Sequence, residues 1–407
     1  METKTYKLDS LCEITSSKRI FYSEYTESGI PFFRSKEIID LFNKNNIATE
    51  LFISKDRYNE IKNKFGVPEK DDMLLTSVGS IGIPYLVKSS DKFYFKDGNL
   101  TWFRNYNRKL IVPLYLYLWT TSSVGKETLM RLSMGAAQPA LTISRLKNLS
   151  LNLPSVSLQQ KIASILSSYD RLIENNTRRI RLLEQMAENL YKEWFVRFRF
   201  PEHEKVEMVN GLPKGWERTV ASSIIDVMSG GTPKTDHPEF YGGNIPFYTP
   251  KDANDSIFVY NTLTNITEEG LTHCNSQLFP RNTLIITARG TVGKLNLLAV
   301  PMAMNQSCFA LQFKQKENPF FLYYTIRTEI AKLKKIANGG VFDTIVVKSF
   351  DHIKLIIPTR SLMDNFNLKV YSILEQVRNL SYQNQLLTRQ RDLLLPRLMS
   401  GKLEVKS

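Results

Sequence analysis

Residues 30–37 of this chain read IPFFRSKE and residues 245–252 read IPFYTPKD, so one short pattern occurs twice at an offset of 215 residues. A second pair follows in the same order, because TSVGSIG at 76–82 matches TARGTVG at 287–293 at an offset of 211. The order is kept and the offset changes little, which makes coincidence improbable, and the period is far longer than that of a solenoid repeat. The sequence therefore predicts a duplicated domain.

A third pair extends the duplication. Residues 135–154, GAAQPALTISRLKNLSLNLP, match residues 339–358, GGVFDTIVVKSFDHIKLIIP, at an offset of 204. Each copy ends this match in Leu-Pro or Ile-Pro, and a long helical pattern follows.

Inside the copies the local patterns are mixed. Short apolar runs at 73–76, 283–287 and 354–358 predict strands. Helical spacing predicts helices at 114–134 and 323–337, with Gly and Pro in the loops between elements. The fold class expected from these patterns is α+β.

The two helical patterns repeat every seven residues. The first has one row of Ile162, Tyr169, Asn176, Leu183 and Leu190, and a neighbouring row of Leu166, Ile173, Ile180, Ala187 and Trp194. The second has Phe366, Ile373, Leu380, Leu387 and Leu394, which is the first set displaced by 204 residues. Sustained heptads with little Gly or Pro favour a coiled coil.

Each helix leaves an apolar stripe that it cannot bury alone. We expect the two to pack on each other as an antiparallel pair with pseudo-two-fold symmetry, through Ile162, Tyr169, Leu183, Leu190, Phe366, Ile373, Leu380, Leu387 and Leu394. The alternative is that each helix packs on its own globular domain. Asn176 is either a buried amide that fixes the register or a solvated residue at a break.

The expected organisation follows from these boundaries. It comprises a first globular domain at 1–154, a long helix at 155–200, a linker at 201–211, a second globular domain at 212–358 and a second long helix at 359–407. The second copy opens with LPKGW at 212–216.

Charge and composition narrow the function. The 407 residues carry a net charge of +14, and both halves of the chain are basic, which suggests a polyanionic partner. The polar N-terminus, the absence of a run of ~20 apolar residues and three widely spaced cysteines fit a cytoplasmic protein. The four histidines and His273-Cys274 lack the spacing of a metal site, so no metal is expected.

Glycine-containing loops are the candidate binding elements. GTVGK at 290–294 is not a Walker loop, because Leu295 stands where that loop needs Ser or Thr for magnesium. Loops of this composition, including SGGTPKT at 229–235, can instead bring backbone N–H groups close to phosphates. Arg, Lys, Asn and Gln can read base edges.

The candidate DNA-binding residues come from corresponding loops of the two copies. They are Lys18, Arg19, Arg34, Ser35, Lys36, Thr76, Ser77, Ser80, Gly230, Gly231, Thr232, Lys234, Thr249, Lys251, Thr287, Arg289, Gly290, Thr291, Lys294, Asn305 and Gln306. For any one of them a solvated or capping role is the alternative.

In this order and duplication, these motifs resemble the specificity subunit of type I restriction-modification systems. The resemblance rests on LPKGW, SGGTPKT, TARGTVGK, Asn305-Gln306-Ser307, the strand-Pro element before each helix and Gln159-Gln160 inside the first. It covers essentially the whole chain. The first copy departs from the pattern, with Ser16-Ser17-Lys18-Arg19 in place of a Gly-Gly-Thr-Pro segment.

The resemblance implies two target recognition domains held apart by the helix pair, each reading half of a bipartite double-stranded DNA site. It implies a non-catalytic chain that binds no cofactor itself. Two methyltransferase subunits, which bind S-adenosylmethionine, would dock on it, and restriction subunits using ATP and Mg²⁺ would join them. The competing hypothesis is a coiled-coil scaffold with two protein-binding domains.

Overall fold

The computed structural model describes residues 2–43, 45, 47, 49–134, 139–315, 317–336 and 344–403. The beginnings of the third repeat match, 135–138 and 339–343, lie outside the described residues. The chain divides into two compact units, Met1–Ile173 with Leu386–Ser407, and Glu174–Gln385. The two units are divided inside the long helices, between residues 173 and 174 and between residues 385 and 386. The domain boundaries expected from the sequence lie at the ends of these helices, and they stay a prediction.

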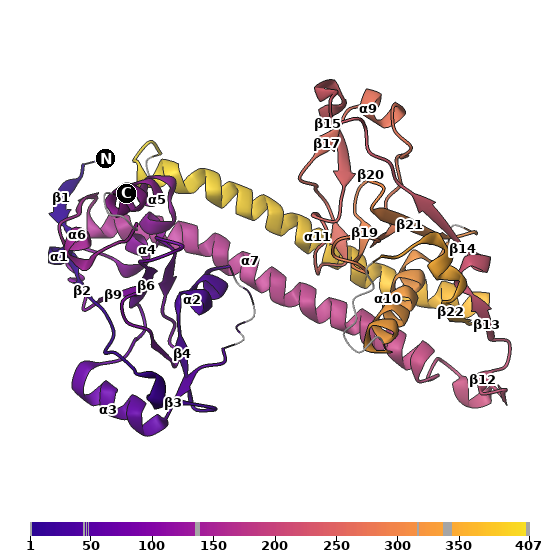
Figure 1. The fold of residues 1–407 in the computed structure, drawn as a ribbon, viewed down its shortest axis with the longest axis horizontal. Coiled ribbons are helices and arrows are strands. Elements are labelled where there is room, and N and C mark those ends of the chain that lie inside the picture. Colours follow the sequence, from indigo (N-terminus) through magenta and orange to yellow (C-terminus); the bar gives the residue numbers. More distant parts are fainter. Residues whose placement is uncertain are drawn as a thin grey trace. The chain divides into compact units, whose positions relative to one another are not determined.

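The first unit contains a mixed domain built on two small sheets (Figure 1). One has the order β2-β9-β6-β7, and the other the order β3-β5-β4-β8 with β4 and β8 parallel. Strand β1 pairs antiparallel with β10, which leads into the long helix. The strands are β1 (Lys4–Lys7), β2 (Glu13–Thr15), β3 (Tyr25–Thr26), β4 (Ile30–Phe33), β5 (Phe52–Ile53), β6 (Met73–Thr76), β7 (Pro84–Leu86), β8 (Tyr94–Phe95), β9 (Leu100–Arg104) and β10 (Ser150–Leu153).

Short helices complete this domain. They are α1 (Leu8–Leu11), η1 (Tyr22–Glu24), α2 (Ser35–Phe42), α3 (Lys55–Phe65), α4 (Pro113–Thr121), α5 (Ser123–Ser133) and α6 (Ile143–Lys147). The single helix predicted at 114–134 is wrong, because Ser122 ends α4 and its hydroxyl accepts a hydrogen bond from Gly125 N at 3.1 Å to cap α5. A side chain at Gly125 would lie 1.9 Å from the carbonyl oxygen of Trp119, so the bend requires glycine.

The second unit repeats this topology in part, with one strand more in its first sheet and one fewer in its second. Its sheets have the orders β14-β21-β18-β19-β16 and β17-β15-β20, with β15 and β20 parallel, and β13 pairs antiparallel with β22. The strands are β13 (Glu217–Val220), β14 (Ile225–Ser229), β15 (Tyr241–Tyr248), β16 (Phe258–Val259), β17 (Asn265–Ile266), β18 (Leu284–Thr287), β19 (Leu295–Leu298), β20 (Ala303–Met304), β21 (Cys308–Phe313) and β22 (Lys354–Ile357). The helices are α8 (Ala221–Ile224), η4 (Pro238–Phe240), α9 (Glu268–Thr272), α10 (Pro319–Ile336) and η5 (Val347–Asp351).

The predicted linker at 201–211 is partly folded. After η2 (Lys192–Val196) and η3 (His203–Lys205), strand β11 (Met208–Val209) pairs with β12 (Leu212–Pro213). Asn210 and Gly211 connect them with φ of 50° and 75°, the conformation that a two-residue Asn-Gly hairpin turn needs. The Phe200 ring lies 5.4 Å from that of Trp216, which ties the segment to the second domain.

The long helices are α7 (Val156–Tyr191) and α11 (Arg360–Met399), and within each unit they pack antiparallel (Figure 1). In the first unit, Asp170 Oδ1 accepts a hydrogen bond from Arg391 Nη1 at 2.6 Å. In the second, Asn384 Nδ2 donates to Thr177 Oγ1 at 3.3 Å. Further along α7, Tyr191 contacts Phe366, with ring centroids 5.9 Å apart. The residue numbers of the contacts therefore rise along α7 and fall along α11, as they do in an antiparallel pair.

Burial differs along the helix rows. Of the predicted interface residues, Ile162, Phe366 and Leu380 are buried, and Tyr169, Leu183, Leu190, Ile373, Leu387 and Leu394 are half-buried. The neighbouring row is more deeply buried on α7, at Leu166, Ile173, Ala187 and Trp194. Asn176 is also buried. These stripes pack on the domain cores as well as on the partner helix, so both expected modes of burial occur. In the described part of the chain, no helix has the length and apolar character that crossing a membrane requires.

Candidate nucleic-acid interface

The loop between β18 and β19 in the second domain is closed by one buried hydroxyl. Thr287 Oγ1 accepts a hydrogen bond from Lys294 N at 3.0 Å and donates one to the carbonyl oxygen of Thr291. Gly293 N also donates to the carbonyl oxygen of Thr287 at 2.9 Å. Gly290 and Gly293 have φ of 76° and 75°, so the turn requires residues without a Cβ. Thr287 thus shapes the loop from inside.

The first domain builds the same loop between β6 and β7. Thr76 Oγ1 accepts from Ile83 N at 2.9 Å and donates to the carbonyl oxygen of Ser80. Gly82 N donates to the carbonyl oxygen of Thr76 at 2.8 Å, and Gly82 has φ of 81°. The sequence similarity at this offset of 211 residues therefore reflects equivalent hydrogen bonds.

The SGGTPKT loop packs directly on the segment after β20. Gly231 N donates to the carbonyl oxygen of Met304 at 3.1 Å, and a Cβ on Gly230 would lie 2.3 Å from that same oxygen. The Thr232 hydroxyl donates to Gln306 Oε1. A Cβ on Gly231 would lie 2.6 Å from the backbone N of Asn275, so both glycines are needed for close backbone packing. Anion binding by this loop stays a prediction.

The segment after β15 joins the same cluster. Asp252 Oδ2 accepts from the amide and the hydroxyl of Thr249 at 2.8 and 2.7 Å. The Thr291 hydroxyl donates to the carbonyl oxygen of Pro250 at 3.3 Å, and Asn305 N donates to that of Tyr248 at 3.0 Å. Four segments that are distant in the sequence, 229–235, 248–252, 287–294 and 304–307, therefore form one surface.

Two of these contacts recur in the first domain. Glu37 Oε2 accepts from Arg34 N at 2.8 Å, in the place of the Thr249–Asp252 cap. Burial opposes ionisation of Glu37, but its hydrogen bonds from Arg34 outweigh this effect, so the pKa of Glu37 lies below its usual value. Lys96 N donates to the carbonyl oxygen of Phe33 at 2.8 Å, as Asn305 does to Tyr248.

The predicted DNA-binding residues fall into three groups by exposure. The exposed ones are Lys18, Arg19, Lys36, Ser80, Thr232, Lys234, Lys251, Arg289, Gly290, Thr291 and Gln306. The half-buried ones are Arg34, Ser35, Thr249, Lys294 and Asn305. The buried ones are Thr76, Ser77, Gly230, Gly231 and Thr287, and burial corrects the expectation of direct contact for these five.

Two of the half-buried cations have intramolecular partners. Arg34 Nη2 lies 2.7 Å from Glu37 Oε1, and Lys294 Nζ contacts Asp255 Oδ1. Their charge is partly neutralised, so the exposed cations Lys234, Lys251 and Arg289 are better placed to attract an anion. Sequence reasoning missed Lys96, which is exposed in the position corresponding to Asn305. Its signal was the polar run at 96–99 after an apolar strand, as at 305–307 after β20.

Each domain is fixed to the helices of its own unit. The buried Gln159 side chain on α7 accepts from Val112 N at 2.9 Å and donates to the carbonyl oxygens of Leu110 and Pro154 at 2.9 and 3.0 Å. On α11, the guanidinium of Arg378 lies 4.3 Å from the centre of the Phe258 ring. These contacts fix each globular domain to a long helix of the same unit.

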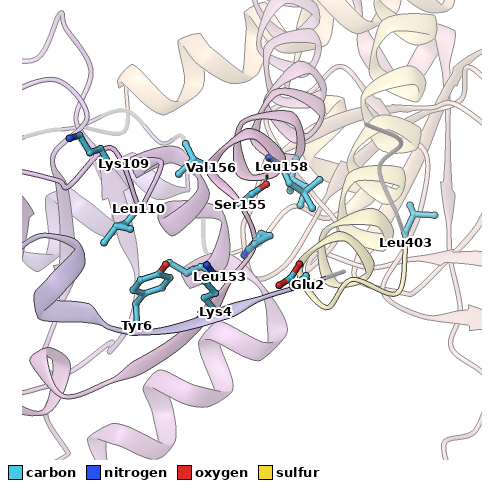
Figure 2. Close-up of a pocket in the computed structure, with 12 residues that line it drawn as sticks. Glu2, Lys4, Tyr6, Lys109, Leu110, Leu153, Ser155, Val156, Leu158 and Leu403 are labelled. Atoms are coloured by element: carbon cyan, nitrogen blue, oxygen red, sulfur yellow. Dashed lines mark hydrogen bonds between the residues drawn. The ribbon is translucent and has the colours of Figure 1, made fainter.

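An open cavity of about 670 Å³ lies elsewhere, beside the start of α7 in the first unit (Figure 2). Its lining includes Lys4 and Tyr6 from β1, Leu153 from β10 and Leu158 from α7. None of the predicted DNA-binding residues lines it. Among the described residues, no three His, Cys, Asp or Glu side chains are arranged to hold a metal ion.

Comparison with known proteins identifies relatives over most of the chain. Residues 1–185 and 213–388 match the family model of the type I restriction modification DNA specificity domain. The Type I restriction enzyme HindI specificity subunit of Haemophilus influenzae is 26% identical, over 89% of this chain and 93% of the relative. The MjaIX specificity subunit of Methanocaldococcus jannaschii is 29% identical, over 83% and 78%.

A solved structure has the same fold. The type I restriction-modification S subunit from M. genitalium matches with a TM-score of 0.65 and 17% identity, over 100% of this chain and 97% of that one. The predicted α+β class with two repeated domains and long helices is confirmed.

Proposed function

The chain belongs to the family of type I restriction-modification DNA specificity subunits, which are the DNA-recognition components of such systems. We propose that each of its two domains reads one half of a bipartite, asymmetric double-stranded DNA site. The supporting observation is that one loop framework is built twice, with equivalent hydrogen bonds but different exposed side chains. The exposed polar side chains of the two domains differ in type and spacing. The first domain has Lys18, Arg19, Lys36 and Lys96, and the second has Lys234, Lys251, Arg289 and Gln306. The two half-sites should therefore differ in sequence.

Within each cluster the exposed cations would bind phosphates and set the position of the domain on the duplex. Arg289 and Gln306 also carry the donor groups that can reach base edges in the major groove. The half-buried Asn305 has its Oδ1 occupied by Ser307 N at 3.1 Å, which favours a role in shaping the loop.

The helix pair would set the unread spacer between the half-sites. Helix α7 has 36 residues and α11 has 40, which correspond to about 54 and about 60 Å at ~1.5 Å per residue. Such lengths suit half-sites about one DNA turn, or ~34–36 Å, apart.

The same helices would hold the partners. Apolar side chains on their outer faces, Leu172, Leu182, Met186, Leu368, Tyr371 and Leu393, are 46–75% exposed and suit docking of two methyltransferase subunits. Those subunits would bind S-adenosylmethionine and flip and methylate adenine. Restriction subunits, where present, would bind ATP with Mg²⁺, so this cytoplasmic chain would itself be non-catalytic and without a cofactor.

Methylation sequencing of a host that expresses the chain with its methyltransferase tests the proposal. We expect one bipartite motif, and replacing residues 212–358 with the second domain of a relative should change only one half of it. A change in both halves would contradict independent reading.

Binding measurements separate the proposal from a protein scaffold. The affinity of the reconstituted complex for a duplex should fall steeply with salt, because each phosphate contact releases about 0.9 counterion. A complex with no affinity for duplex DNA would favour the scaffold.

A further inference from the structure

The first domain carries an exposed aromatic pair at the end of its Ser16–Tyr22 segment. Phe21 is 61% exposed and Tyr22 is 88% exposed, the largest fraction among the large hydrophobic side chains in the part of the chain that the structure describes. Phe65 is a third partly exposed aromatic side chain, and Lys18 Nζ lies 5.1 Å from the centre of its ring. Exposed apolar side chains that lie close together mark a candidate binding surface.

The exposed pair is held by its backbone. Phe21 N donates to Glu24 Oε2 at 2.7 Å, and Glu24 Oε1 lies 2.7 Å from Arg57 Nε on α3. Tyr22 also packs edge-to-face on Tyr25, with ring centroids 5.9 Å apart. The rings are thus presented on a fixed turn, so binding through them loses little conformational entropy.

This aromatic turn adjoins the loop cluster of the first domain. Lys18 N donates to the hydroxyl of Tyr94 at 2.6 Å, and Tyr94 lies on β8, which leads to Lys96. Gly98 N donates to Ser16 Oγ at 3.4 Å, a second connection between the same two segments.

The charge around the rings fits a polyanion. The Arg19 guanidinium lies 5.8 Å from the centre of the Phe21 ring, and its side chain is 70% exposed. Of the acidic groups near the turn, Glu24 pairs with Arg57, whereas Asp97 lies 3.9 Å from Arg19 and offsets part of its charge. In a duplex the bases are stacked on one another, so exposed aromatic rings can contact thymine methyl groups in the major groove while exposed cations bind phosphates.

We infer that Phe21 and Tyr22 make apolar contact with nucleotides of the half-site read by the first domain, an inference that rests on the proposed DNA-binding function. The corresponding segment of the second domain, SGGTPKTDH at 229–237, contains no Phe, Tyr or Trp, and its one aromatic ring, the imidazole of His237, stacks on Phe240. A contact through Phe and Tyr side chains is therefore specific to the first domain, and Arg19 adds the neighbouring phosphate contact.

The test measures the affinity of the full chain, in complex with its methyltransferase, for a short duplex. The duplex contains the sequence that this complex methylates. We expect the double variant F21A/Y22A to bind about tenfold more weakly or worse, the size of one lost base contact in a duplex site. Because no charge is removed, the slope of log affinity against log salt should stay unchanged. Arg19→Ala should instead reduce that slope by about 1.

Controls separate this contact from damage to the fold. Met208→Ala removes a comparably exposed apolar side chain, 54% exposed in the β11–β12 hairpin, and should bind as wild type does. Tyr22→Phe should retain affinity, and F21A/Y22A should unfold at the wild-type temperature.

Three outcomes would overturn the inference. Wild-type affinity of F21A/Y22A, while the unmodified complex binds, shows that the rings do not touch DNA. Loss of methyltransferase binding by this variant shows that they contact protein. A wild-type complex that binds no duplex removes the proposed function and the inference with it.

Discussion

The buried hydroxyl that closes the loop of the second domain provides the sharpest test of the site. Thr287→Val keeps the shape of the side chain but removes one donor and one acceptor. The variant loses the hydrogen bond from Lys294 N, 3.0 Å long in the structure, and the donation to the carbonyl oxygen of Thr291. At about 1 kcal/mol net for each hydrogen bond, the loop should lose about 2 kcal/mol of stability.

This loss corresponds to about a thirtyfold increase in the equilibrium for loop opening, at ~1.4 kcal/mol per tenfold. Amide hydrogen exchange reports it directly, and we expect faster exchange at Gly293 and Lys294 than in wild type. DNA affinity should also fall, without a change in salt slope, since no charge is removed.

Two matched variants sharpen the comparison. Thr76→Val removes the equivalent bonds in the first domain and should affect only that loop. Thr291→Val removes an exposed 3.3 Å hydrogen bond to Pro250 and should have a small effect. The reasoning is refuted if Thr287→Val exchanges like wild type, or if Thr291→Val is as damaging.

Three further predictions concern packing, pH and the helices. Gly230→Ala places a Cβ 2.3 Å from the carbonyl oxygen of Met304, so thermal unfolding should show that the free energy of unfolding falls by about 2 kcal/mol. The control Ser229→Ala should change it little, and equal effects of the two variants would contradict the packing argument. Burial raises the pKa of Asp72 to about 6, above its value in the unfolded chain, so between these two pKa values the folded state binds the proton more tightly than the unfolded state does. As pH rises from about 4 to 6, the wild-type free energy of unfolding should therefore fall by about 3 kcal/mol relative to that of Asp72→Asn. The asparagine side chain of this variant can keep the hydrogen bonds from Trp102 Nε1 and Glu69 N because both reach one oxygen, and parallel urea-unfolding curves for the two proteins across this range would disprove the assignment. Removing one heptad from α7 should change the spacer of the methylated motif or abolish methylation, and an unchanged motif would rule out the helices as a ruler.

Local patterns in the sequence were sufficient for the elements and for the duplication. Heptads predict long amphipathic helices because side-chain spacing along a helix depends only on neighbours a few residues away. The same reasoning missed the break at Ser122, because the apolar spacing continues through it and only the hydroxyl cap and the tight contact at Gly125 reveal two helices.

Side-chain roles in the site depend on contacts between distant segments. Thr287 and Arg289 belong to one motif, yet the first is buried inside the loop and the second is exposed. The polar character of a side chain gives no information about which of these environments it occupies. The aromatic turn at Phe21 was also missed, since its exposure becomes apparent only once the neighbouring elements are in place.

The sequence by itself determined that this protein is one domain-and-helix unit built twice, because the repeats and heptads are visible in the order and spacing of neighbouring residues. Only the tertiary structure decided which residues form the candidate DNA surface. Thr232 meets Gln306 across 74 residues, and Gly230 is required because another backbone passes beside it. Such contacts depend on how the sheets bring separate loops together, and no pattern within a single loop encodes them.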